Sequence, residues 1–492
     1  MFSFARFCLF SLKSPRLTIK VSQQAKMISS LKTPLDFIVH PSEMPLESKA
    51  YEFCKQYVLL SADQKLDVLK EMSVKYNFDQ SATGKAAESY ITSQNKGTGV
   101  ILKAADRLKS SLNPSYAYAF NRIRKLDGGV KFIVDVRADI LKMLPSLDFN
   151  DEATHHLKTL NNYVKEILSF SFNVGFMKLE RITWDSSCYM LEKISQYEAV
   201  HPVRSWTDIK QRVGPYRRCY VFTHSCMPRE PIVVLHTALT SEISSSIASI
   251  VRQTKARSSS EDSTVKFQND IENPKEIKAA IFYSITSTQK GLHGIELGNQ
   301  LIKKVVKEVL AEFPHITQLS SLSPIPGFRD WFLMEIKKMR GGSSVISSFF
   351  SEKDQSVLKN VFSAADQQSL WSSLQSLVAS NQWIHNEDLK ELLKTPLMKI
   401  CAHYLYSEKR RSNALNSVAH FHLRNGAVMW RLNWLADLSP RGLDNSCGMM
   451  VNYRYYLDET EFNSKNYVEN YIVTASDDFK NLLIPALSKS SL

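Results

Sequence analysis

The chain has 492 residues, of which 43% are hydrophobic and 23% are charged. This length exceeds the usual domain size of roughly 100–200 residues, so we expect at least two domains, and the composition excludes the disordered and fibrous classes. The formal net charge of +13 indicates a surface that attracts anions, and no apolar run reaches the roughly 18–20 residues of a membrane-spanning helix.

The N-terminal segment is basic and contains no acid. Residues 1–35 hold six Lys or Arg side chains among Ser and Phe, and the first acidic residue is Asp36. Such a segment is typical of a mitochondrial transit peptide, with an ordinary basic terminus as the simpler alternative. We therefore expect residues 1–35 to be a transit peptide, and Met27 offers an internal start that removes most of it.

Residues 36–178 are predicted to form an all-α helical bundle. Ser61 and Gln64 stand at the spacing of a capping box. Apolar residues then recur at helical spacing in three segments. These are Leu66, Val68, Leu69 and Met72; Ile101, Leu102, Ala105, Leu108 and Leu112; and Leu157, Leu160, Val164, Ile167 and Leu168. No chemical constellation stands out here, so we expect this domain to serve packing and oligomer assembly.

The pattern changes to strands further along. Residues 218–224 and 232–236 are predicted to pair as a hairpin, since residues 227–231 between them are rich in turn formers. Residues 251–276 are polar and are interpreted as a solvated loop, and residues 279–285 form a short apolar run of strand length.

A βαβ unit follows from the next pattern. Residues 289–298 contain three glycines and lead into a helix with apolar residues at i, i+3 and i+4 spacing, which ends at Pro314. A second strand is predicted at residues 316–322, so strand, loop, helix and strand follow in order. Beyond it we expect helices at 355–377 and 387–406, and strands at 428–435 and 450–457.

The glycine loop at residues 289–298 is a candidate phosphate site. Free N–H groups at a helix N-terminus favour an anion, and glycine lets the backbone approach it closely. The spacing matches neither the P-loop nor the dinucleotide fingerprint. By itself the loop leaves phosphate binding and an ordinary glycine turn equally open.

Ser323 lies in a stiff segment after the second predicted strand. Residues 320–328 read Ser-Ser-Leu-Ser-Pro-Ile-Pro-Gly-Phe, and the two prolines hold the backbone extended. Ligands of α/β folds gather at the carboxyl ends of strands, where such a segment can present a hydroxyl. Capping of the turn by Ser323 is the alternative.

Two histidines, His420 and His422, stand two residues apart. In a strand they would share a face, but no Cys, Asp or Glu at ligand spacing completes a zinc site, so we expect no metal. One of them is a candidate proton donor near neutral pH, and a structural histidine is the alternative. The seven cysteines are scattered, without a Cys-x-x-Cys pair, which excludes a disulfide framework and a cysteine zinc site.

Taken together, several of these segments resemble the malonyl-CoA decarboxylase family. The matching stretches are residues 213–220, 231–241, 291–306, 320–328, 422–434 and 452–455. The resemblance implies an α+β protein, in which the helical domain at 36–178 serves oligomerisation and residues 179–492 form a catalytic domain with the α/β fold of GNAT-type acyltransferases. It also implies a homo-oligomer, with a tetramer suspected.

The resemblance further assigns site residues. The family's catalytic serine falls on Ser323 and its catalytic histidine on His422, while Glu296 and Tyr455 resemble the polar residues that surround the histidine. The loop that cradles the CoA pyrophosphate corresponds to His293, Gly294, Ile295, Glu296, Leu297, Gly298 and Asn299. The substrate would be malonyl-CoA and the product acetyl-CoA, with no cofactor, no metal and no nucleic acid, and the reaction would serve malonyl-CoA turnover and the regulation of fatty acid metabolism.

Two rival functions stay open. An amine acetyltransferase of GNAT type would use the same CoA loop but would not require the Ser323 and His422 pair, and a non-catalytic CoA-binding scaffold would leave the pair idle. The chain ends in Ser490, Ser491 and Leu492, a degenerate form of the peroxisomal Ser-Lys-Leu address. We therefore expect the mitochondrial matrix, with cytoplasm and peroxisome as further locations.

Overall fold

The structure is a computed structural model that describes residues 35–36, 38–39, 47–250, 272–340 and 345–483. The expected transit peptide up to residue 34, most of the polar loop at 251–276 and the C-terminal tripeptide lie outside these residues. The chain divides into two compact units. The helical unit comprises residues 1–176, 224–228 and 289–295, and the sheet unit comprises residues 177–223, 229–288 and 296–492.

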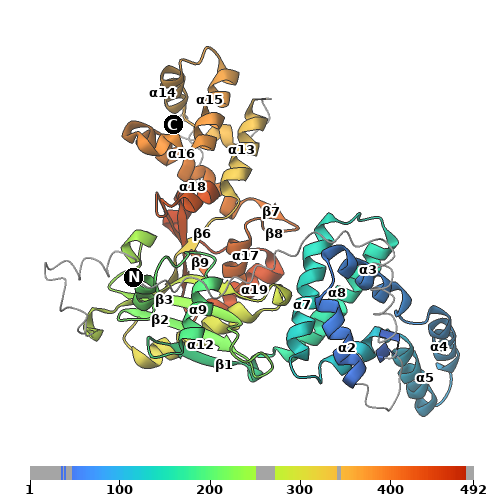
Figure 1. The fold of residues 1–492 in the computed structure, drawn as a ribbon. Helices are drawn as coiled ribbons and strands as arrows, with labels where there is room; N and C mark the ends of the chain where they lie inside the picture. Colours follow the sequence, from blue (N-terminus) through green and yellow to red (C-terminus); the bar gives the residue numbers. More distant parts are fainter. Residues whose placement is uncertain (1–34, 37, 40–46, 251–271, 341–344, 484–492) are drawn as a thin grey trace, which may run out of the picture. The chain divides into compact units, whose positions relative to one another are not determined.

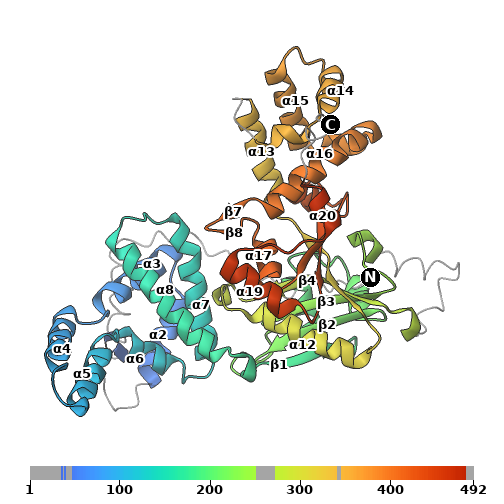
Figure 2. The same cartoon turned by 180° about the vertical axis from the view of Figure 1, so that it is seen from behind.

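The helical unit confirms the helices predicted from the sequence (Figures 1 and 2). Its helices are α2 (Glu47–Val58), α3 (Ala62–Lys75), α4 (Gln80–Ser93), α5 (Thr98–Ser111), α6 (Tyr116–Ile123), α7 (Gly129–Met143) and α8 (Glu152–Ser171). The capping box at Ser61 and Gln64 opens α3 as predicted. The unit's core lies where α3, α7 and α8 pack together, and α8 buries Leu157, Leu160, Val164 and Leu168 there.

Helix α5 also forms as predicted, yet none of its residues is buried. It packs against α4 as a helical hairpin, and α4 is the element of the described residues that contacts it most extensively. The apolar period therefore predicted the helix correctly but not its burial.

The sheet unit is built on one mixed sheet of eight strands. The strand order is β1-β2-β3-β4-β5-β10-β6, and β9 pairs with β10. The bounds are β1 (Lys178–Ile182), β2 (Arg217–Thr223), β3 (Val233–Thr240), β4 (Ala279–Ser287), β5 (Gln318–Ser321), β6 (Ser323–Pro324), β9 (Val428–Asn433) and β10 (Met450–Tyr455). A helical region followed by a mixed sheet with helices confirms the α+β class.

The predicted supersecondary units are present. β2 and β3 pair antiparallel as the expected hairpin. β4, the loop, α12 (Leu297–Glu312) and β5 form the expected βαβ unit, with β4 and β5 parallel. The second strand of this unit ends at Ser321, and Ser323 begins the short strand β6 instead of standing in a loop, because β10 pairs with both β5 and β6.

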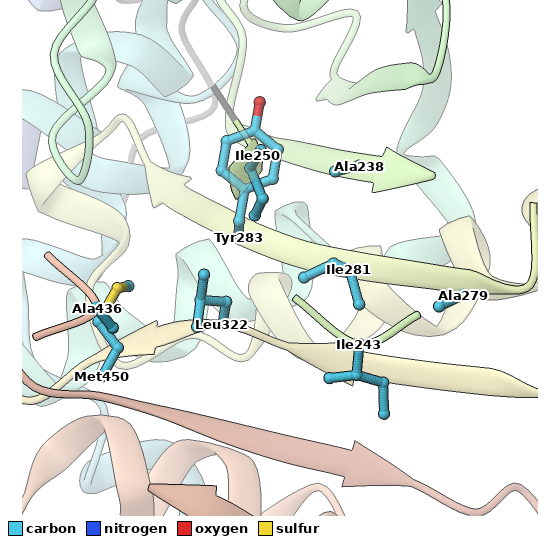
Figure 3. Packing of buried hydrophobic residues seen from close by; sticks show 9 residues of the cluster. All are labelled: Ala238, Ile243, Ile250, Ala279, Ile281, Tyr283, Leu322, Ala436 and Met450. Atoms are coloured by element: carbon cyan, nitrogen blue, oxygen red, sulfur yellow. The ribbon is translucent and has the colours of Figure 1, made fainter. Parts of the chain in front are cut away.

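Helices cover both faces of the sheet's first half. Cys219, Val221 and Val234 pack against α9 (Cys188–Tyr197) and α10 (Trp206–Arg212). The alternate residues of β2 face α12, where Arg218 pairs with Glu312 and Lys304 lies over the Phe222 ring. Nearer the middle of the sheet, a second buried cluster contains Tyr283, Ile281 and Leu322, and Met450 of β10 belongs to it beside Ala436 (Figure 3). The sheet is thus a buried platform.

The C-terminal helices follow the prediction with one correction. The helix expected over 355–377 is two helices, α14 (Glu352–Phe362) and α15 (Gln367–Ser380), because Asp366 caps the second one. α13 (Phe328–Met339) and α16 (Glu387–Tyr406) complete this group. The remaining elements are the strands β7 (Lys409–Arg410) and β8 (Asn413–Ala414) and the helices α17 (Ser417–Arg424), α18 (Pro440–Ser446), α19 (Thr460–Asn470) and α20 (Asp477–Asn481). Across the described residues, no helix is long and apolar enough to cross a membrane.

Candidate active site

Three side chains that the sequence singled out meet in the sheet unit. Ser323 stands on β6, His422 on α17 and Tyr455 on β10. The Ser323 Oγ lies 2.9 Å from Nε2 of His422, and Nδ1 of the same ring lies 2.7 Å from the Tyr455 hydroxyl. Both ring nitrogens of His422 are therefore occupied by hydroxyl groups.

Helix α17 is held in place at both ends. Its N-cap residue Asn416 accepts the backbone N–H groups of Val418 and Ala419 and donates to the Pro326 carbonyl oxygen, 2.9 Å away. This bond ties the helix to the segment that carries Ser323. At the other end, Gly426 takes a φ of 77°, a conformation that suits glycine, and a Cβ there would collide with the Thr460 carbonyl.

The site is almost closed to solvent. Ser323, His422 and Tyr455 are 5%, 4% and 7% exposed. Burial lowers the pKa of His422 from 6.5 to about 3, and burial also raises the pKa of Tyr455. At physiological pH the site therefore holds a neutral imidazole and a neutral phenol.

Two further residues contact the hydrogen-bonded side chains of Ser323 and His422, and the sequence analysis did not single them out. Ser321 on β5 accepts a hydrogen bond from the Ser323 hydroxyl at 2.8 Å. The ring of Tyr453 stacks on the His422 ring, with centroids 4.4 Å apart and planes 15° from parallel. Residues two apart on a strand lie on one face, as do Ser321 and Ser323, and likewise Tyr453 and Tyr455. This period is the sequence signal that would have found Ser321 and Tyr453.

Glu296, which was expected beside His422, pairs with another residue. Its carboxylate forms an ion pair with Arg424, two residues beyond His422, and its side chain is half exposed. Because both ring nitrogens of His422 bond to hydroxyls, Glu296 does not hydrogen-bond the imidazole directly. His420 faces away and bonds to Tyr467 on α19.

The candidate CoA loop is the stretch in which the chain passes from one unit to the other. His293, Gly294 and Ile295 belong to the helical unit, and Glu296, Leu297, Gly298 and Asn299 belong to the sheet unit. Gly294 has a φ of 78°, and Glu296 is the N-cap residue of α12. The local conformation is thus a glycine turn followed by a helix N-terminus.

The glycines on either side of this turn are closely packed, and glycine is required at Gly291. In the helical unit, a Cβ on Gly291 would lie 1.8 Å from the Val134 carbonyl oxygen, and Arg137 donates to the Gly291 carbonyl. In the sheet unit, Gly298 leaves room for Ile285 and Phe421, the first of which would be 3.3 Å from its Cβ. Among the described residues, no group of three or more His, Cys, Asp or Glu side chains could hold a metal ion.

A buried imidazole held between two hydroxyls on a mixed α+β fold is an arrangement suited to an enzyme of the acid–base type. Comparisons with known proteins narrow this class. The family model described as the malonyl-CoA decarboxylase C-terminal domain matches residues 175–492, and that of the N-terminal domain matches residues 76–172. The chain belongs to the malonyl-CoA decarboxylase family and is a carboxy-lyase.

Individual relatives agree over nearly the whole chain. The chain is 42% identical to "Malonyl-CoA decarboxylase, mitochondrial" of Rattus norvegicus over 463 residues, which covers 94% of this chain and 90% of that protein. Two solved structures of malonyl-CoA decarboxylase are also similar. The one from Agrobacterium vitis has a TM-score of 0.75 at 26% identity and covers 93% of this chain and all of that one (100%). The one from Rhodopseudomonas palustris has a TM-score of 0.73 at 27% identity and covers 93% and 99%.

Proposed function

We propose that this protein converts malonyl-CoA to acetyl-CoA and carbon dioxide through an enolate that His422 protonates, without a cofactor. The observation that carries the proposal is the buried hydrogen-bonded chain of Ser323, His422 and Tyr455. Its role would lie in malonyl-CoA turnover and in the regulation of fatty acid metabolism.

The reaction needs stabilisation of one oxyanion and delivery of one proton. The bond between the α-carbon and the carboxylate breaks, carbon dioxide leaves, and the electron pair moves to the thioester as an enolate. The α-carbon then forms a C–H bond with a proton from His422. Ser323 would lie against the malonyl group and hold His422 toward it, and one preorganised donor at the developing oxyanion contributes roughly 2.7–4 kcal/mol.

The low pKa of His422 is compatible with this role. Among the described residues, the hydrogen-bond partners of the buried ring are neutral hydroxyls and none is a carboxylate, so burial lowers the pKa of His422. The malonyl carboxylate, and later the enolate, would bring a negative charge to the ring, and an opposite charge within about 4–6 Å raises the pKa of an imidazole. Substrate binding is therefore coupled to uptake of the proton that the reaction consumes.

We further propose a GNAT-type fold for residues 179–492 and CoA binding by residues 293–299. The parallel pair of β4 and β5 with α12 between them supports this, since the glycine turn precedes the helix N-terminus where phosphate binds. Glu296, paired with Arg424, would act on His422 only through helix α17.

The assay is incubation of the purified protein with malonyl-CoA, without amine, metal or other additions, followed by detection of acetyl-CoA and carbon dioxide. Equimolar formation of both supports the proposal. An amine acetyltransferase would instead consume acetyl-CoA only with an amine present and leave malonyl-CoA intact, and a scaffold would bind CoA without turnover.

For location we propose the mitochondrial matrix, with cytoplasm and peroxisome as further sites. Support comes from the basic, acid-free residues 1–35 and from relatives whose names include "mitochondrial". Fluorescent fusions at either end, each masking one terminal signal, test this, and a full-length protein tagged at its C-terminus that stays wholly cytosolic contradicts the matrix assignment.

We also propose that residues 36–178 mediate a homo-oligomer, with a tetramer suspected, which light scattering of the purified protein tests.

A further inference from the structure

The hydrogen-bonded chain at His422 extends one residue further than the family resemblance implies. Ser321 on β5 lies behind Ser323, its oxygen 2.8 Å from the Ser323 Oγ. Ser321 is fully buried, and its backbone carbonyl accepts a hydrogen bond from the Asn452 amide at 2.8 Å. The Ser321 oxygen also accepts the backbone N–H of Tyr453 at 3.3 Å. Ser321 is thus fixed on two sides.

The direction of each proton in this chain depends on the charge of His422. A neutral imidazole has one N–H and one acceptor nitrogen, but an imidazolium donates from both nitrogens. Nε2–H can then bond to Ser323 only if the Ser323 oxygen accepts, which requires the Ser323 proton to point elsewhere. The Ser321 oxygen is the hydroxyl acceptor within reach.

We propose that Ser321 is a positioning residue for decarboxylation. Its oxygen accepts a hydrogen bond from the Ser323 hydroxyl, so that the lone pairs of Ser323 point toward the protonated His422. The inference rests on the proposed function and deepens it. Without Ser321, the Ser323 hydroxyl donates its hydrogen bond to Nε2 of His422. This favours the neutral ring, so less of the imidazolium that donates the proton is present.

The surroundings of His422 contain few other groups able to set its protonation. The described groups that contact the ring, its hydroxyl partners or the neighbouring residues of α17 are Tyr453 and Tyr455 on β10, Ser321 on β5, Ser323 on β6, the pair of Arg424 and Glu296 at the end of α17, and Tyr467 on α19, which bonds to His420. The phenol of Tyr455 can accept from Nδ1–H, and the stacked Tyr453 ring attracts a cation. Together with Ser321, both favour the imidazolium once substrate is bound.

The test compares Ser321→Ala with Ser320→Ala. Ser320 is the adjacent residue on β5 and is equally buried. Within the described part of the chain, its hydroxyl donates to the backbone carbonyls of Ser321 and Tyr453. It is therefore a matched control for loss of a buried hydroxyl. Circular dichroism and thermal melting establish that both variants are folded, and kcat and KM for malonyl-CoA are measured between about pH 6 and 9.

We expect Ser321→Ala to lower kcat by about 3- to 10-fold, the usual worth of one hydrogen bond, with KM nearly unchanged. Because the neutral ring is favoured, the alkaline limb of the kcat profile should move to lower pH. Ser320→Ala should change neither. If the alanine variant is unstable, Ser321→Cys, which keeps the volume but is a weak acceptor, should show the same loss.

The outcomes separate the two proposals. Wild-type protein that forms no acetyl-CoA from malonyl-CoA overturns the proposed function and this inference with it. Active wild-type protein, together with a Ser321→Ala profile that coincides with that of Ser320→Ala, overturns the role of Ser321 alone.

Discussion

Substitution of Tyr455 by Phe isolates one end of the chain at His422. The Tyr455 hydroxyl lies 2.7 Å from Nδ1 of His422 in a site that is closed to solvent. Tyr455→Phe keeps the ring and removes the oxygen, so Nδ1–H of the imidazolium loses its acceptor. A buried donor without a partner costs roughly 1–3 kcal/mol, and 1.36 kcal/mol corresponds to a tenfold change in rate. We therefore expect kcat to fall by about 5- to 150-fold.

Steady-state formation of acetyl-CoA from malonyl-CoA, measured across pH, is the assay. KM should change little, and the alkaline limb of kcat should move to lower pH, because the protonated ring has lost a stabilising bond. Tyr467→Phe is the matched control, since Tyr467 makes the equivalent contact to His420 at 2.9 Å and its substitution should leave kcat unchanged. A folded Tyr455→Phe protein with wild-type kcat and pH profile would refute the proton path through His422.

Four further outcomes follow from the site. His422→Asn should lower kcat by about 10²–10⁴-fold with little change in substrate affinity, as turnover assays and titrations would reveal. Gly294→Val should weaken CoA binding in calorimetry, because a side chain is strained at a φ of 78° and blocks close approach of a phosphate. Tyr453→Phe should keep both melting temperature and turnover, since the buried Tyr453 hydroxyl has no hydrogen-bond partner among the described residues. Acid should destabilise the wild-type protein more than His422→Asn, because His422 takes up its proton at higher pH in the unfolded chain than in the folded one. The stability that is present above the unfolded pKa of 6.5 is therefore lost as the pH falls toward the folded pKa of about 3. Urea unfolding at several pH values measures this loss.

The sequence predicted local structure well where one period dominates. The apolar spacing of the segment with Leu157 and Val164 predicted α8, and the strand–loop–helix–strand order predicted the βαβ unit that contains α12. The sequence did not predict which elements pack against one another. Helix α5 has the same apolar period as α8, but whether its residues are buried depends on neighbours that its own sequence does not specify.

The site shows the same limit at the level of single residues. A spacing of two between His420 and His422 suggests a shared face if the segment is a strand. The segment is the helix α17, in which residues two apart point to nearly opposite sides, so His420 meets Tyr467 and His422 meets Ser323. Ser321 and Ser323 also stand two apart, and there the strand period does hold, because β5 and β6 both pair with β10.

A buried histidine without a compensating charge is costly for folding and useful for binding an anion. The neutral ring avoids this cost, since burial lowers the pKa of His422 to about 3. A malonyl carboxylate that enters the site loses water as well, and a ring that becomes protonated with it gives each charge a partner. The product thioester carries no carboxylate, so the reason for the ring to stay protonated disappears when carbon dioxide leaves and the α-carbon takes the proton. In the proposed mechanism, the same burial that keeps His422 neutral before the reaction favours transfer of its proton during the reaction and release of a neutral acetyl group afterwards.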